Sequence, residues 1–146
     1  MHRAPSRTPR HGNADVTGLG PLVELLECPT GRSGGLSDLG SALSCSTCGA
    51  NYPVEERIAT FEREPDAYSA NYDRIAADDL LEPKTPSVVK EIFAELVIER
   101  AQGVVCDLGC GDGYVVRRVP SDTRIAVDIA RAYLELLPPE VLALWA

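Results

Sequence analysis

A glycine-rich turn, VVCDLGCGDGY at residues 104–114, is the stretch whose residue types most directly suggest chemistry. An apolar run ends in Asp107, and glycines follow at every second position: Gly109, Gly111 and Gly113. Glycines let a backbone approach a ligand closely, and an acid just before such a turn suits a cofactor with a cationic amino group better than a pyrophosphate. The turn therefore predicts a cofactor site, with helix capping and tight packing as the structural alternative.

The spacing of this turn disfavours two other kinds of nucleotide site. A dinucleotide-binding turn has the pattern G-x-G-x-x-G, whose third glycine would fall on Tyr114, so a nicotinamide oxidoreductase is a weaker alternative. A phosphate-binding P-loop ends in G-K-[ST], and no lysine follows Lys90. Cys110 has no nearby histidine to act as a base, because the only histidines are His2 and His11, so a packing role is favoured for it.

Alternating helices and strands are predicted around the turn. A helix is expected from Pro86 to the residue before Gly103, with Thr85 as its N-cap and one apolar face. Strands are predicted at VVCDL, TRIAVDI and VLALWA, with helices at YVVRRV and ARAYLELL between them. This order is typical of an α/β fold with a doubly wound, Rossmann-like parallel sheet, in which ligands bind at the carboxyl ends of the strands. Only three such strands are present, so we expect an incomplete sheet: the chain is truncated after the third strand begins, or a protein partner completes the sheet.

The two strand ends together resemble the class I S-adenosylmethionine-dependent methyltransferases, whose first motif reads as VVCDLGCGDGY does. The resemblance extends to IAVDIA, where Asp128, 19 residues after Gly109, falls where the family places the acid that holds the ribose hydroxyls. It implies that Asp107 faces the amino-acid end of the cofactor, that the three glycines line its methionine part, and that Ile129 lies near the adenine. NYDRIA around Tyr72 is similar to a stretch that contributes to the cofactor lid in these enzymes. No residue is indicated as the catalytic base.

Three cysteines ahead of this region have the spacing of metal ligands. Cys45 and Cys48 form a C-x-x-C pair, and Cys28 begins a similar knuckle 17 residues before Cys45, but Gly31 stands where the second cysteine of that knuckle would be. A tetrahedral site would take its fourth ligand from one of three sources: Asp38, His11 or water. The residues leave two alternatives open, a zinc site and a metal-free fold.

The stretch from LVELLECPTGRSGGL to LSCSTCGANYPV resembles the small zinc-ribbon-like domain known as an activator subunit of tRNA methyltransferases, which is also found fused ahead of bacterial methyltransferase domains. The resemblance implies a β module that keeps its fold by core packing where cysteines are lost. It also implies a role in holding a substrate or a partner.

Composition divides the 146-residue chain into four parts. We expect a disordered basic leader at 1–16, the zinc-ribbon-like module at 17–61, an acidic connector with one or two short helices at 62–83, and the partial cofactor-binding domain at 84–146. The formal net charge is -8, and the first 14 residues hold three of the 14 basic groups and no acid. The remaining acidic body should repel a phosphate backbone. No run approaches the roughly 18 apolar residues that span a bilayer, and no signal peptide precedes the module, which predicts a cytoplasmic protein without membrane contact.

The expected function is methyl transfer from S-adenosylmethionine to an unidentified acceptor, with a small molecule favoured over RNA because of the acidic body. The alternative is a non-catalytic adaptor, in which the cysteine module and the exposed edge of the incomplete sheet recruit a catalytic methyltransferase. Whether this chain is itself an enzyme stays open at this point.

Overall fold

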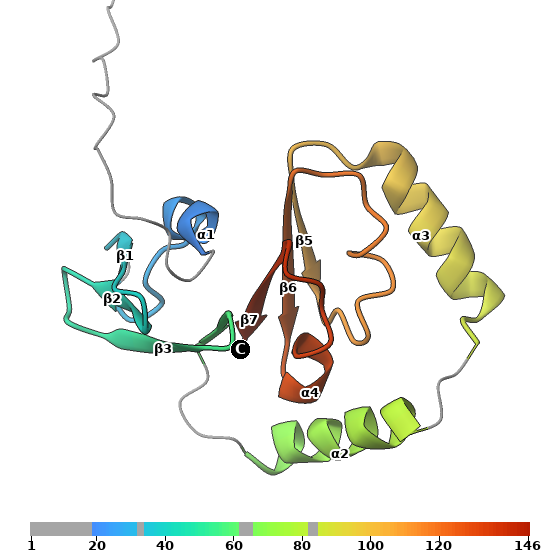
Figure 1. Ribbon diagram of the computed structural model, residues 1–146, viewed down its shortest axis with the longest axis horizontal. Coiled ribbons are helices and arrows are strands. Elements are labelled where there is room, and N and C mark those ends of the chain that lie inside the picture. Colours follow the sequence, from blue (N-terminus) through green and yellow to red (C-terminus); the bar gives the residue numbers. More distant parts are fainter. Residues whose placement is uncertain (1–18, 32–33, 62–65, 82–84) are drawn as a thin grey trace, which may run out of the picture.

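The computed structural model of the chain describes residues 19–31, 34–61, 66–81 and 85–146. The leader predicted at 1–16 lies outside the described residues, as does His11 within it. The described residues form a mixed α/β fold, in which helices surround one curled sheet of seven strands (Figure 1). The elements follow one another as α1 (Gly20–Leu25), β1 (Leu36–Asp38), β2 (Ala42–Cys45), β3 (Asn51–Glu55), β4 (Ile58–Thr60), α2 (Ala67–Leu81), α3 (Val88–Arg100), β5 (Val104–Leu108), β6 (Thr123–Asp128), α4 (Arg131–Leu134) and β7 (Val141–Trp145).

Two segments of the chain contribute strands to this one sheet, in the order β1-β2-β3-β4-β7-β6-β5. Strands β1 to β4 pair antiparallel with one another, whereas β5, β6 and β7 pair in parallel. The two groups join where β4 pairs in parallel with β7, so that Ile58 lies opposite Ala143 and Thr60 opposite Trp145. The segment with the cysteines is therefore continuous with the sheet that carries the glycine turn.

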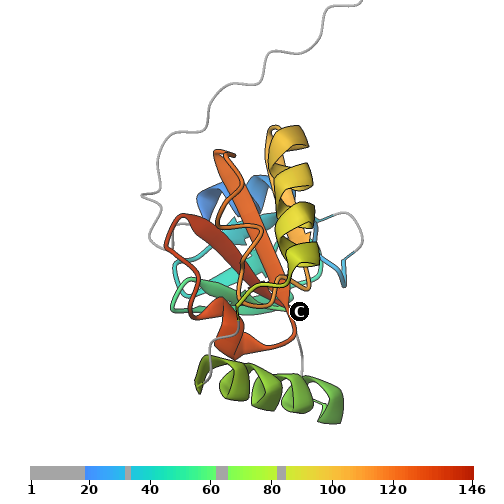
Figure 2. The same cartoon turned by 90° about the vertical axis from the view of Figure 1, so that its right-hand side faces the viewer.

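Alternating side chains along β6 and β7 build a core on each face of the sheet, because successive residues of a strand point to opposite faces. The first core joins residues of α1 and β1 to β3 to three residues of the central strands: Ile125, Leu142 and Leu144. The second core joins α4 and the turn after β5 to their neighbours along the same strands: Ala126, Val141 and Ala143. Figure 2, viewed from the α3 side, shows the N-terminal strands and α1 behind the parallel strands.

The three strands predicted in the C-terminal half are confirmed as β5, β6 and β7, and ARAYLELL contains the short helix α4. The helix predicted at YVVRRV, residues 114–119, is wrong, because residues 114–118 form turns. Arg117 donates a backbone hydrogen bond to Gly113 in the α-helical pattern, but Arg118 donates to Val115, one residue closer. Three of the six residues are valines, whose branched side chains disfavour helix, and Pro120 cannot continue one.

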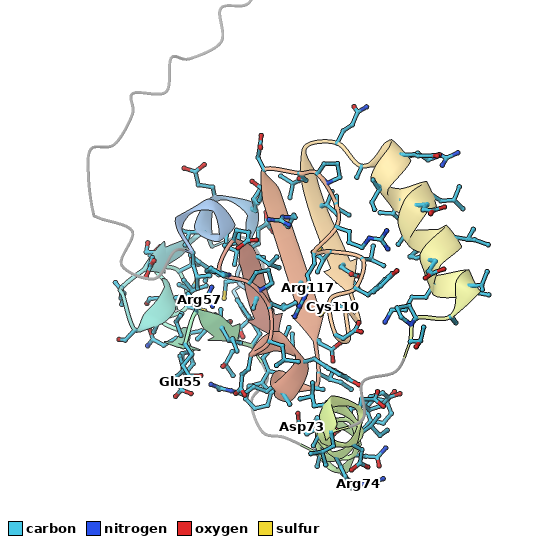
Figure 3. All side chains as sticks on the ribbon, turned by 45° about the vertical axis from the view of Figure 1, so that its right-hand side comes forward. Glu55, Arg57, Asp73, Arg74, Cys110 and Arg117 are labelled. Atoms are coloured by element: carbon cyan, nitrogen blue, oxygen red, sulfur yellow. The ribbon has the colours of Figure 1, made fainter. Side chains whose placement is uncertain are left out.

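The connector forms one helix, α2, which crosses below the ends of the parallel strands in both views (Figures 1 and 2). Helix α3 begins two residues later than predicted, because the hydroxyl of Ser87, rather than that of Thr85, accepts the capping hydrogen bond from the backbone of Lys90. Of the α3 residues only Ala94 is buried. Five apolar α3 side chains are exposed: Val88, Val89, Ile92, Phe93 and Leu96. Figure 3 shows α3 beside the sheet with its side chains spread around it. No helix in the described part of the chain is long and apolar enough to cross a membrane.

Candidate cofactor site and cysteine cluster

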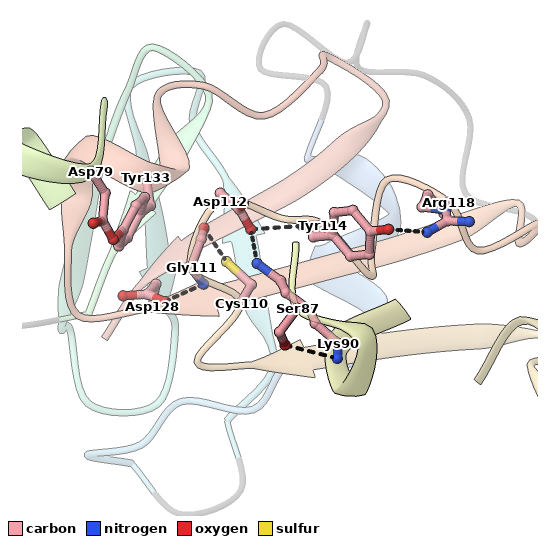
Figure 4. Close-up of polar contacts among 10 residues, drawn as sticks. All are labelled: Asp79, Ser87, Lys90, Cys110, Gly111, Asp112, Tyr114, Arg118, Asp128 and Tyr133. Atoms are coloured by element: carbon pink, nitrogen blue, oxygen red, sulfur yellow. Dashed lines mark hydrogen bonds and ion pairs between the residues drawn. The ribbon is translucent and has the colours of Figure 1, made fainter. Parts of the chain in front are cut away.

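The glycine turn lies at the carboxyl ends of the parallel strands and is tied to the end of β6. The backbone of Gly111 donates a hydrogen bond of 2.8 Å to Oδ2 of Asp128 (Figure 4). The backbone of Ala130 donates one of the same length to Oδ1. The backbone of Gly109 donates to the carbonyl of Val127 at 2.8 Å. Asp128 is only 7% exposed, so its buried carboxylate is satisfied by two backbone donors. Since a carboxylate has about four acceptor positions, it can still accept bonds from a ligand.

Two of the turn glycines serve different purposes. Gly111 has φ +52°, and a Cβ atom there would meet no atom within 4 Å, so this position is open towards the space beside the turn. Gly113 has φ +72°, and a Cβ atom there would clash with the side chain of Leu137. The third glycine of the motif is therefore required for packing of the turn against the segment after α4.

A cavity of about 430 Å³ opens between the turn, the end of β6 and helix α2. Five of the seven predicted cofactor residues line it: Tyr72, Gly109, Gly111, Asp128 and Ile129. Its volume falls within the range of about 300–1,000 Å³ that is typical of small-molecule sites. The structure thus brings together residues that are up to 57 positions apart in the sequence.

The two other predicted residues, Asp107 and Gly113, do not line this cavity. The carboxyl group of Asp107 accepts a hydrogen bond from the backbone of Val116, on the far side of the turn. Burial raises the pKa of Asp107 above its ordinary value, and the negative charge of Asp128 adds to that rise. Asp107 thus stabilises the turn through its hydrogen bond with Val116, and its carboxyl group interacts electrostatically with Asp128, which lines the cavity.

Helix α2 is held over the cavity by a contact that the sequence analysis missed. The hydroxyl of Tyr133 donates a hydrogen bond of 2.7 Å to the carboxylate of Asp79. Burial and the Asp79 carboxylate both raise the pKa of Tyr133, so the phenol stays protonated. Tyr133 also lines the cavity. The sequence does contain a signal for Tyr133, because this residue lies on the helix directly after the strand-end acid Asp128, five residues further along the chain. No local sequence pattern marks Asp79.

A second cavity, of about 440 Å³, shares Gly111 and Tyr133 with the first and extends to the start of α3. Lys90 forms an ion pair of 2.8 Å with Asp112 there, and it lies 5.1 Å from the ring centre of Tyr114 (Figure 4). The guanidinium of Arg118 lies 4.9 Å from the same ring centre. These contacts link the first turn of α3 to the glycine turn and place both signs of charge beside Gly111.

Cys110 is buried beneath the turn, in the second core. Burial raises the pKa of its thiol to about 12, with the nearby carboxylates of Asp128 and Asp107 adding to the effect. A thiol that stays protonated is a poor nucleophile. The packing role favoured for Cys110 agrees with this position.

The three cysteines predicted as metal ligands form a cluster in the N-terminal part of the sheet, towards the opposite end of the strand order from β5. The Sγ atoms of Cys28, Cys45 and Cys48 all lie within 4.8 Å of one another, with 3.6 Å between the first and the last. Cys45 ends β2, and Cys48 lies in the turn that leads to β3. The hydroxyl of Tyr52 lies 3.1 Å from the sulfur of Cys28, and chiefly because of this hydrogen bond the pKa of Cys28 is lowered to about 6.

The donor set of this cluster fits a thiophilic metal, because three cysteine sulfurs at these distances match the ligands that zinc prefers. Among the described residues no histidine, aspartate or glutamate joins the three sulfurs. Asp38, which was one expected source of a fourth ligand, instead accepts a hydrogen bond of 2.7 Å from the backbone of Gly40. The other, His11, lies outside the described residues.

Comparison with protein-family models and with curated proteins finds no match to this sequence. The geometry of the two sites is therefore the basis for assigning a function.

Proposed function

We propose that this protein binds S-adenosylmethionine in the cavity between the glycine turn and α2, and that it belongs to the methyltransferase reaction class. The observation that carries the proposal is the joint lining of one cavity by Tyr72, Gly109, Gly111, Asp128 and Ile129. The parallel order β7-β6-β5, with a glycine turn after β5 and an acid at the end of β6, supports an incomplete Rossmann-like sheet.

The residues of the cavity match the parts of this cofactor. Asp128 offers its remaining acceptor positions to the ribose hydroxyls, while Ile129 and Tyr72 offer apolar surface to the adenine. Lys90 and Asp112 in the neighbouring cavity offer both signs of charge to an α-amino-acid group. When bound, the cofactor supplies an electrophilic methyl group, and the contribution of the chain is to hold it in line with a nucleophile of the acceptor. With a net charge of -8, a small-molecule acceptor is favoured over RNA. A cytoplasmic location stays a prediction.

We further propose that Cys28, Cys45 and Cys48 hold zinc in a zinc-ribbon-like module. Support comes from the three clustered sulfurs, the antiparallel strands β1 to β3 around them, and the hydrogen bond between Tyr52 and Cys28. Such an outer hydrogen bond orients a ligand and stabilises its charged form.

Calorimetric titration of the chain with S-adenosylmethionine tests the cofactor, with NADH as the control ligand. We expect saturable binding of the methyl donor alone, and an Asp128→Asn variant should weaken it by about tenfold or more, because hydrogen bonds to charged groups contribute roughly 1.5–3 kcal/mol. Asp122→Asn is the matched control, since Asp122 is an exposed acid at the other end of β6, and it should bind as the wild type does.

Asp128 also holds the turn, so a Tyr72→Ala variant is needed to separate ligand contact from folding. This variant leaves the bond between Gly111 and Asp128 intact and should still weaken binding. Binding of NADH in place of S-adenosylmethionine would support an oxidoreductase. A folded wild-type chain that binds neither ligand would contradict the proposal.

A second candidate function, a non-catalytic adaptor, is favoured by the unpaired edge of the sheet at strand β5 and the groove beside it. The outer edge of β5 pairs with no strand of the described residues, and a groove of about 640 Å³ lies between this strand and α3. Its lining is largely apolar and includes Phe93, Leu96 and Val104. An adaptor that recruits a catalytic methyltransferase through this edge would bind that protein without binding the cofactor, which the same calorimetric titration distinguishes.

A further inference from the structure

The main chain of Gly31 closes one side of the cysteine cluster. A Cβ atom at residue 31 would lie 3.2 Å from the sulfur of Cys48, 3.3 Å from that of Cys45 and 3.4 Å from that of Cys28, so even one added carbon atom would be crowded there. The backbone N–H of Gly31 also donates a hydrogen bond of 3.2 Å to the sulfur of Cys28. A ligand from outside the chain therefore has no room between Gly31 and the three sulfurs.

The other neighbours of the cluster add no further metal ligand. A Cβ atom at Gly34 would meet the sulfur of Cys45 at 2.5 Å and the hydroxyl oxygen of Thr47 at 2.8 Å, so this side is crowded as well. The hydroxyl of Tyr52 forms a hydrogen bond of 3.1 Å with the sulfur of Cys28. Among the residues that the structure describes, no histidine or carboxylate joins the three sulfurs. The described part of the chain thus offers a donor set of three thiolates.

We propose that Cys28, Cys45 and Cys48 form a three-coordinate copper site, which binds Cu(I) more tightly than it binds zinc. This inference rests on the metal site proposed above, goes beyond it in the identity of the ion, and is independent of methyl transfer. Zinc in a structural site is almost always four-coordinate and tetrahedral, so three ligands without a fourth leave its coordination incomplete. Cu(I) is a soft ion that selects thiolate ligands, and three of them complete a trigonal plane around it.

The burial of the cluster suits Cu(I) for a second reason. Cys28 and Cys45 are each only 1% exposed, so a bound ion would be shielded from water and from the oxidants dissolved in it. Cys48 is exposed and lies in the turn after β2, which gives the ion a route to the two buried sulfurs. The cluster therefore combines a dry interior with one accessible ligand.

Anaerobic titration of the reduced chain with Cu(I), buffered by the chelator bathocuproine disulfonate, tests the copper site. We expect one Cu(I) per chain, a thiolate-to-copper charge-transfer absorption in the ultraviolet, and an X-ray absorption spectrum with three sulfur neighbours and no fourth ligand. When Cu(I) is added to the zinc-loaded chain, it should release the zinc, which a chromogenic zinc indicator measures. An excess of zinc should not displace the Cu(I).

Cys48→Ser is the main variant, because it removes the exposed ligand and leaves the buried Cys28 and Cys45 in place. It should weaken Cu(I) binding by about tenfold or more, since the loss of even an outer-shell partner of a metal ligand costs about 10–100-fold in affinity. Its X-ray absorption spectrum should show two sulfur neighbours. Cys106→Ser is the matched control, because Cys106 is also an exposed free cysteine but lies on β5, and this variant should bind Cu(I) as the wild type does.

The outcomes separate the copper site from the zinc site. A chain that keeps its zinc when Cu(I) is added, with four neighbours around the zinc, overturns the copper site but leaves the zinc site standing. A nitrogen neighbour of Cu(I) that disappears after His2→Ala and His11→Ala replacement also overturns it, because a histidine would then be a ligand. Equal Cu(I) binding by the wild type and Cys48→Ser overturns it as well. A chain that binds neither ion overturns both proposals.

Discussion

The glycines of this chain differ in what their side-chain positions face, although several share a positive φ. Gly113 and Gly103 have φ of +72° and +65°, yet only Gly113 is packed against another residue, Leu137. The motif DLGCGDG therefore contains a packing requirement in addition to the ligand-binding role that we propose for it. This distinction cannot be read from the letters of the motif, because it depends on a leucine that lies 24 positions further along the chain.

Alanine substitution at these two glycines should separate backbone strain from steric overlap. Gly103→Ala should destabilise the protein by about 1–2 kcal/mol, the cost of a left-handed conformation for an L-residue. Gly113→Ala should cost about 1–3 kcal/mol more, because buried Leu137 has to shift. Urea unfolding followed by circular dichroism measures both. Equal losses in the two variants would show that Leu137 relaxes freely.

The hydrogen bond between Tyr52 and Cys28 is the largest cause of the lowered pKa of the Cys28 thiol. The pKa of Cys28 is lowered to about 6 from an ordinary value of 9.0. The hydrogen bond of Cys28 with Tyr52 therefore stabilises the metal-free fold fully above pH 9, and this stabilisation is lost as the pH falls through about 6. Tyr52→Phe keeps the ring stacked on Phe61 but removes the hydroxyl. It should move the thiolate titration of Cys28, followed by ultraviolet absorbance, towards pH 9. Tyr68→Phe, an exposed tyrosine on α2, should leave the titration where it is.

Among the elements, those defined by local patterns were predictable and those defined by distant partners were not. The apolar runs at 104–108, 123–128 and 141–145 predicted β5, β6 and β7 because buried parallel strands read as continuous apolar stretches. β4 has only three residues, and its pairing with β7 has no local signal. In the same way Asp128, Gly111 and Ile129 were found from one motif pair, whereas Asp79 enters the site only because α2 crosses the sheet ends.

The ion pair of Lys90 with Asp112 links helix α3 to the glycine turn, whereas most apolar side chains of α3 are exposed. Lys90→Met should speed amide hydrogen exchange in α3 by roughly two- to fivefold, since a partly exposed ion pair such as that with Asp112 contributes about 0.2–1 kcal/mol. Exchange in β6 should not change. Glu99→Gln, an exposed change at the other end of α3, is the control. Unchanged exchange in Lys90→Met would mean that the groove contacts alone hold the helix.

For the whole molecule, the shared sheet predicts a single unfolding transition. Leu43 is fully buried in the core that also contains Leu142 and Leu144 of β7. Leu43→Ala should destabilise the protein by about 2–5 kcal/mol. The loss should appear equally in the fluorescence of Trp145, the only tryptophan, and in the reactivity of the N-terminal cysteines.

Leu39→Ala is the control for this prediction, because Leu39 lies in the same module with 65% of its surface exposed. It should change neither probe. A Leu43→Ala protein whose cysteines become reactive while the Trp145 transition stays at the wild-type urea concentration would contradict a single cooperative unit.

The pairing of β4 with β7 also has a consequence during synthesis on the ribosome. Ile58 and its partner Ala143 are 85 positions apart, so β1 to β4 leave the ribosome long before the strand that covers β4 is translated. In that interval the nascent chain presents an uncovered strand edge, which is a template for pairing with other chains. Three charged residues, Glu55, Glu56 and Arg57, stand directly before β4, and charges that flank an apolar strand disfavour such association. The emergence of β7, and not that of the cysteine module, is thus the step at which this sheet acquires its centre.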